Sequence, residues 1–200
     1  MNQSQVIHKD VLSLNIKTFM KAYTFLLAGF LILSVIGRGQ APAPADMILN
    51  EAYSVAASEK KNVFVLFHAS WCGWCHKMDT AMNDNSVKKF FTDNYVIRHL
   101  VVYESKGKEN LENPGALDLL KKYKGDEQGI PYWLIFDKNG KLLADSKLRP
   151  DGGGLETGNN TGCPASEKEV AHFVKVVKET SSLKDAALSV IEKRFRENEN

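Results

Sequence analysis

Apolar positions after residue 46 alternate between helical spacing and continuous runs, which predicts alternating helices and strands. Helical spacing of the apolar residues predicts a first helix over residues 47–58, with Asp46 before it as the N-cap. The continuous apolar run 63–67 has the length of a central strand that is buried on both faces. A helix followed by a buried strand is therefore expected at the start of the folded region.

A second helix is expected directly after this strand. The apolar residues that share one face of it are Cys75, Met78 and Met82. Cys72 is therefore placed near the N-terminus of that helix. A short helix over 86–92 and a strand rich in β-branched residues over 95–102 complete a strand–helix–strand unit.

The next part of the chain predicts an insertion, a helix and a β-hairpin. Residues 104–115 are polar and end in a Pro-Gly break, so they are expected to form a surface insertion before a helix over about 117–123. The apolar runs 132–136 and 141–144 flank an Asn-Gly turn, which is a strong local signal for a hairpin.

Two helices are expected to close the chain. A Gly-rich loop over 150–164 ends near Ser166, whose spacing to Glu169 fits a capping box, and an apolar stripe follows. Apolar residues at helical spacing over 183–195, interleaved with charges, predict an added amphipathic helix. The element order predicts an α/β fold with a mixed central sheet, parallel first and then a hairpin, and an added C-terminal helix.

The N-terminal segment has the layout of a signal peptide. Residues 22–36 form a run of fifteen residues without a charge, preceded by Lys17 and Lys21 and followed by a Gly/Pro/Ala linker. The run is short for a membrane span, which needs about 20 apolar residues, so cleavage is favoured over an uncleaved anchor. Met20, which with Lys21 directly precedes the run, is an alternative start.

The chain is thus divided into a targeting segment with its linker, residues 1–45, and a folded domain, residues 46–200. This division predicts an exported protein, periplasmic or secreted, that meets the membrane only if the apolar segment stays uncleaved. The formal net charge is +2, from 26 basic and 24 acidic side chains, which gives no reason to expect nucleic acid as a partner.

The candidate chemistry lies in the Cys72-x-x-Cys75 pair. Because three cysteines are too few for a disulfide scaffold, the pair is interpreted as a redox centre. The thiolate is the reactive form, and the free amides and partial positive charge of a helix N-terminus stabilise it at Cys72. Cys72 is therefore expected to attack and Cys75 to resolve. Trp71 either offers a contact surface for a protein partner or packs on the sheet.

The segment 67–78, FHASWCGWCHKM, resembles the thioredoxin superfamily at its Trp-Cys-Gly-x-Cys core. Over about residues 47–180 the chain is similar to exported bacterial thioredoxin-like proteins. The resemblance implies a thioredoxin-like fold, which is a three-layer sandwich, and a thiol–disulfide oxidoreductase that needs no cofactor. Its expected partners are protein thiols or disulfides and a further redox partner of unknown identity.

The resemblance also implies which residues touch the substrate. A cis-proline faces the cysteines in this superfamily, and Ile130-Pro131 stands at the matching place before the hairpin. Substrate contacts are accordingly expected at five residues besides the redox-active pair. These are Trp71, Gly73, Trp74, Ile130 and Pro131.

Two departures from the superfamily pattern leave the direction of electron flow open. Thioredoxins carry a buried aspartate six residues before the first cysteine, where this chain has Leu66. They have Gly-Pro between the cysteines, where this chain has Gly73-Trp74, and this dipeptide influences the stability of the reduced form.

Other candidate residues are interpreted more plainly. His76 is expected to be a surface residue, and His68 either reaches the site or binds a loop. Cys163 is expected to be a bystander rather than a third redox partner or an intermolecular link. No metal site is expected, because one Cys-x-x-Cys supplies too few ligands. The alternative function is a binding module that holds a protein or a soft metal ion such as Cu(I) through the two thiols.

Overall fold

Four strands form a mixed sheet in the order β2-β1-β3-β4 in the computed structural model, which describes residues 41–199. Strand β1 pairs parallel with β2 and antiparallel with β3, and β3 pairs antiparallel with β4. The strands are β1 (Asn62–His68), β2 (Tyr95–Val101), β3 (Tyr132–Phe136) and β4 (Leu142–Asp145). The predicted mixed sheet, parallel first and then a hairpin, is confirmed.

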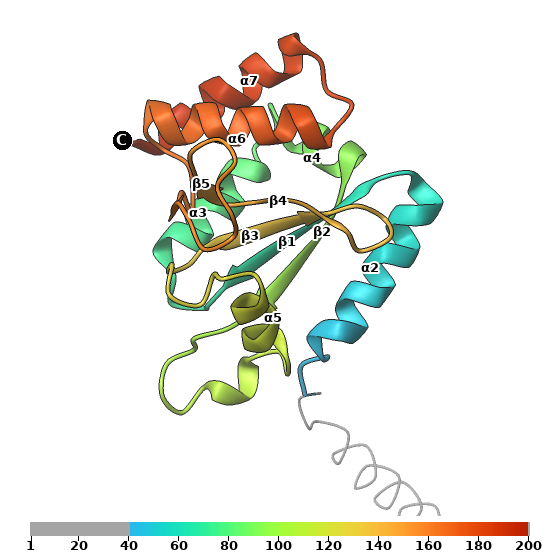
Figure 1. Cartoon of the computed structure of the whole chain (residues 1–200), viewed down its shortest axis with the longest axis vertical. Helices are drawn as coiled ribbons and strands as arrows, with labels where there is room; N and C mark the ends of the chain where they lie inside the picture. The colour runs from blue at the N-terminus through green and yellow to red at the C-terminus, as the bar shows by residue number, and fades with distance from the viewer. Residues whose placement is uncertain (1–40, 200) are drawn as a thin grey trace, which may run out of the picture. The chain divides into compact units, whose positions relative to one another are not determined.

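Helices cover both faces of the sheet, so the predicted three layers are confirmed (Figure 1). On one face lie α3 (Gly73–Met82), α4 (Lys88–Asn94), α6 (Glu167–Thr180) and α7 (Asp185–Arg196). On the other lie α2 (Ala45–Glu59) and α5 (Ala116–Lys122). Successive residues of a strand point to opposite faces, so Phe64 and Leu66 join the first cluster while Val63 and Val65 join the second.

The boundaries of two helices test the predicted caps. Ser166 caps α6, and Ser166 and Glu169 form the predicted capping box. The predicted N-cap of α2 is wrong, because the helix begins at Ala45 after Pro44, and Asp46 lies in its first turn. Pro44 occupies the N-cap position without a side-chain cap bond, and the Asp46 carboxylate accepts the N–H of Met47.

The segment between β4 and α6 contains a small second sheet that the sequence pattern did not predict. Strands β5 (Lys147–Leu148) and β6 (Asn159–Asn160) pair antiparallel. Strand β6 lies inside the predicted Gly-rich loop over 150–164, and β5 lies just before it. Two asparagines provide no alternating apolar pattern, so β6 has no signal in the sequence. Thr161 fixes the pairing by donating its N–H to the carbonyl of Ser146. We call residues 146–163 the hairpin insertion.

The added C-terminal helix packs on the rest of the domain. Leu188, Ile191 and Phe195 of α7 are buried, and the Phe195 ring lies 4.6 Å from that of Phe173 in α6. Two 3₁₀ turns, η1 (Glu109–Leu111) and η2 (Glu197–Glu199), complete the described elements. Residues 1–40, with the apolar segment and Met20, lie outside the described residues. Within 41–199 no helix is both long and apolar enough to cross a membrane.

Candidate active site

The cysteine pair lies where β1 ends and α3 begins. Cys72 is the N-cap residue of α3, and its Sγ accepts the N–H of Cys75 at 3.1 Å. The two cysteines form a disulfide, with their Cα atoms 5.2 Å apart and each side chain at most 3% exposed. The positive end of a ten-residue helix and one backbone N–H therefore act directly on the sulfur of Cys72.

The Ile130-Pro131 segment lies beside Cys72. In the sheet Tyr132 pairs with Phe67, so the two residues before Tyr132 lie next to the turn that follows β1. The peptide bond between Ile130 and Pro131 is cis. The carbonyl oxygen of Ile130 lies 3.7 Å from Cys72 Sγ. The structure thus brings the predicted Ile130-Pro131 segment next to the sulfur of Cys72.

Residues 45–138 match the family model described as thioredoxin-like. The chain contains a thioredoxin-like domain. Similar solved structures include a disulphide isomerase from Xylella fastidiosa Temecula1, at 19% identity over 68% of this chain and 93% of that chain, with a TM-score of 0.49. They also include DsbH oxidoreductase, at 20% identity over 72% of this chain and 88% of that chain, with a TM-score of 0.38.

The oxidised C-terminal domain of DsbD from Neisseria meningitidis is similar at 17% identity, over 53% of this chain and 84% of that chain, with a TM-score of 0.38. Among curated proteins no sequence matches the chain significantly.

Two tryptophans flank the disulfide of the thioredoxin-like domain at its surface. Trp71 is 57% exposed and Trp74 is 52% exposed. The indole N–H of Trp71 donates to the carbonyl of Tyr103 at 2.7 Å, and the Lys77 ammonium lies 5.0 Å from the centre of the Trp74 ring. Gly73 between the cysteines is also exposed. Most of both indoles is therefore available to a partner, and Trp71 does not pack as a buried residue.

The predicted surface insertion holds the turn that leads into the cysteines. Ser70 donates its backbone N–H and its hydroxyl to the Glu104 carboxylate, at 2.6 and 2.7 Å. These two bonds are the main reason why the pKa of Glu104 is lowered. Nothing in the sequence pattern identified Ser70 or Glu104, because their contact joins residues 34 positions apart.

The histidines near the disulfide have separate surroundings. His76 is exposed, as predicted, and its Nε2 lies 2.9 Å from the carbonyl oxygen of Ser70. His68 is half-buried, and its ring centre lies 5.1 Å from that of His99. Burial, followed by the neighbouring His99, lowers the pKa of His68, which favours its neutral form. Among the described residues, no group of three or more His, Cys, Asp or Glu is placed to hold a metal ion.

Cys163 lies in the wall of a groove beside the site. Its side chain is 5% exposed, and its Sγ lies 3.4 Å from the amide nitrogen of Asn198. Burial raises the pKa of the Cys163 thiol to about 12, so the thiol stays protonated. This environment is that of an inert structural cysteine and agrees with the expected bystander.

The groove itself was not predicted from the sequence. It has a volume of about 290 Å³, and we call it the Pro131 groove. The residues that line this groove include Trp74, Ile130, Pro131, Asn160, Gly162 and Cys163. Half of these come from the hairpin insertion, so this segment forms one wall next to the predicted substrate residues.

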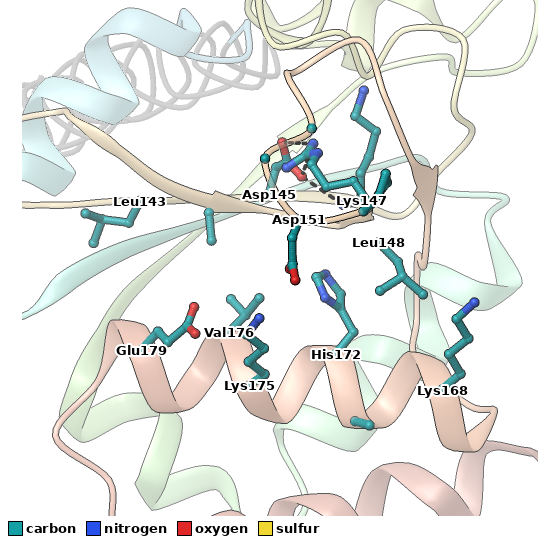
Figure 2. A pocket seen from close by; sticks show the side chains of 16 residues that line it. Leu143, Asp145, Lys147, Leu148, Asp151, Lys168, His172, Lys175, Val176 and Glu179 are labelled. Atoms are coloured by element: carbon teal, nitrogen blue, oxygen red, sulfur yellow. Dashed lines mark hydrogen bonds and ion pairs between the residues drawn. The ribbon is translucent and has the colours of Figure 1, made fainter.

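A second cavity, of about 540 Å³, lies between the hairpin insertion and α6 (Figure 2). His172 points from α6 toward Asp151 and Leu148, whereas the amine of Lys147 points away from the helix. Neither Cys72 nor Cys75 lines this cavity, so it is separate from the redox pair.

Proposed function

We propose that the protein is a thiol–disulfide oxidoreductase that acts on protein substrates outside the cytoplasm. The observation that carries this proposal is the sulfur of Cys72, bonded to Cys75, at the N-terminus of α3 and 3.7 Å from the Ile130 carbonyl oxygen. The apolar run 22–36 supports the exported setting. The residue types and their placement supply all the groups that disulfide exchange requires.

In the reducing direction the Cys72 thiolate attacks one sulfur of a partner disulfide. The partner's sulfur–sulfur bond breaks, a mixed disulfide with Cys72 forms, and the other partner sulfur leaves as a thiolate. The Cys75 thiolate then attacks Cys72 Sγ, which forms the intramolecular disulfide and releases the second partner thiol. Two electrons pass from the dithiol to the partner, and the reverse sequence oxidises a partner dithiol.

Each named residue has a role in this scheme. The N–H of Cys75 and the α3 N-terminus stabilise the Cys72 thiolate, so this thiol leaves and attacks more readily than an ordinary one. The exposed rings of Trp71 and Trp74 offer an apolar surface to the partner, with Gly73 leaving the space between them open. Ile130 and Pro131 lie where an extended partner segment would pass beside Cys72.

Cysteine variants test this function. We expect Cys72→Ser to abolish turnover of a peptide disulfide, and Cys75→Ser to accumulate a mixed disulfide with the peptide at Cys72, because the resolving thiol is missing. Turnover is followed by thiol release, and the adduct is located by mass spectrometry.

The double variant Cys72→Ser/Cys75→Ser is the control, since it retains only the buried Cys163. It is expected to form no adduct. Unchanged turnover in Cys72→Ser would refute the proposed chemistry. Turnover by none of the proteins, with Cu(I) held by the wild type alone, would favour the binding-module alternative.

A further inference from the structure

Asn160 in β6 holds the segment that faces the cysteines. Its side-chain nitrogen Nδ2 lies 3.2 Å from the carbonyl oxygens of both Gln128 and Gly129, and 3.0 Å from that of Pro131. Its Oδ1 accepts the N–H of Gly162 at 2.9 Å. The amide nitrogen has two N–H groups, which are shared among the three carbonyls of the 128–131 segment, while the oxygen is engaged by Gly162.

The carbonyl that Asn160 does not touch is the one at the active site. Of the four carbonyls from residue 128 to residue 131, three lie against Asn160, while that of Ile130 lies 3.7 Å from Cys72 Sγ. A peptide unit whose neighbours on both sides are held has little freedom to rotate. The contacts of Asn160 therefore determine where the Ile130 carbonyl points.

Asn160 can act in this way because the hairpin insertion is itself firmly attached. The indole N–H of Trp133 in β3 donates to the Gly162 carbonyl at 3.0 Å, and the N–H of Thr161 donates to the Ser146 carbonyl at 2.9 Å. The buried ammonium of Lys147 donates to the carbonyls of Lys124 and Leu155. Lys147 thus holds the start of the 124–131 loop, while Asn160 holds its end.

We propose that Asn160 is a positioning residue, which orients Ile130 and Pro131 for a substrate chain lying beside Cys72. This inference rests on the proposed function, because it concerns the substrate of the same site. An extended peptide gains affinity from main-chain groups held in place before it binds. Asn160 touches neither the α3 N-terminus nor the Cys75 N–H, the groups that stabilise the Cys72 thiolate, so its main effect is expected on substrate binding.

Asn160→Ala tests the inference, with Asn159→Ala as the matched control. Asn159 is the other residue of β6, is exposed, and makes none of the contacts to the 128–131 segment. We expect Asn160→Ala to lower kcat/KM for a peptide disulfide about tenfold relative to the control, mainly through a higher KM. The rate at which the reduced variant attacks a small aromatic disulfide should stay within about twofold of wild type.

Hydrogen exchange gives a readout that does not depend on turnover. Peptides that cover residues 126–133 should exchange faster in Asn160→Ala than in Asn159→Ala, because the backbone of this segment is no longer held. If Asn160→Ala does not fold, Asn160→Asp takes its place. It has nearly the same size and still accepts the Gly162 N–H, but it presents an acceptor to the three carbonyls.

The outcomes separate the two proposals. A wild type that turns over no disulfide refutes the proposed function, and the exchange measurement still decides whether Asn160 holds the loop. Equal peptide kcat/KM in both variants, with active wild type, overturns the positioning role. An equal loss toward the peptide and the small disulfide also overturns it, because Asn160 would then act on Cys72 or on the fold as a whole.

Discussion

The buried thiol of Cys163 should resist alkylation in the folded, reduced protein. Burial raises its pKa to about 12, so at pH 8 about one molecule in 10⁴ carries the thiolate. An ordinary thiol with a pKa of about 8.5 is about one quarter ionised at this pH. Ionisation alone therefore slows the reaction of Cys163 roughly 2,000-fold relative to an ordinary thiol.

The assay is a timed reaction of the reduced protein with iodoacetamide, followed by mass spectrometry of its proteolytic peptides. Cys72 should react first, because the α3 N-terminus and the Cys75 N–H favour its thiolate. Cys163 should react only after guanidinium has unfolded the domain.

The double variant Cys72→Ser/Cys75→Ser isolates the rate at Cys163. If Cys163 in this folded variant reacted within about tenfold of its rate in guanidinium, the reasoning from burial would be refuted. A slow rate that rises only with denaturant would show that the third thiol takes no part in exchange.

Two further predictions concern the export of the protein and the pH dependence of its stability. When residues 1–200 are expressed in a bacterial host, the envelope fraction should contain a mature protein that starts near Asp46, as read by intact mass, and an unprocessed chain in the cytoplasm would contradict export. Burial lowers the pKa of His172 in the folded state, so the unfolded chain binds the proton more readily and stability should fall as pH drops below about 6.5. His172→Phe, which can keep the stacking on Trp133, should flatten this part of the urea-midpoint profile, and an unchanged slope would contradict it.

The core of the site could be predicted because its signals are local. An apolar run with five buried residues, Val63 to Phe67, ends a few residues before Cys72, and the next apolar positions have helical spacing. These patterns identify a strand, a turn and a helix without knowledge of the rest of the chain. The sequence therefore placed Cys72 at a helix N-terminus, and the structure makes it the N-cap of α3.

The surroundings of the pair could not be predicted, because they depend on contacts between distant residues. Asn160 meets the 128–131 segment across about 30 positions, and Glu104 meets Ser70 across 34. Both contacts join a polar side chain to backbone or hydroxyl groups, which leaves no periodic pattern. The wrong N-cap assignment of Asp46 has a different cause. An aspartate suits both the N-cap and the first turn of a helix, and in α2 Asp46 lies in the first turn while Pro44 is the N-cap.

The local motif and the contacts between distant residues imply different roles within the site. In the proposed function, the reactivity of Cys72 depends on α3 and the Cys75 N–H, which belong to the motif itself. The insertions contact the site through side-chain bonds around it, from Glu104 to Ser70 and from Asn160 to the Ile130-Pro131 segment. Substitutions in the surface insertion or the hairpin insertion should therefore alter which partner binds, while the reduction potential stays close to that of the wild type. Changes between the cysteines, at Gly73 and Trp74, should alter the potential, because only these residues lie inside the disulfide loop.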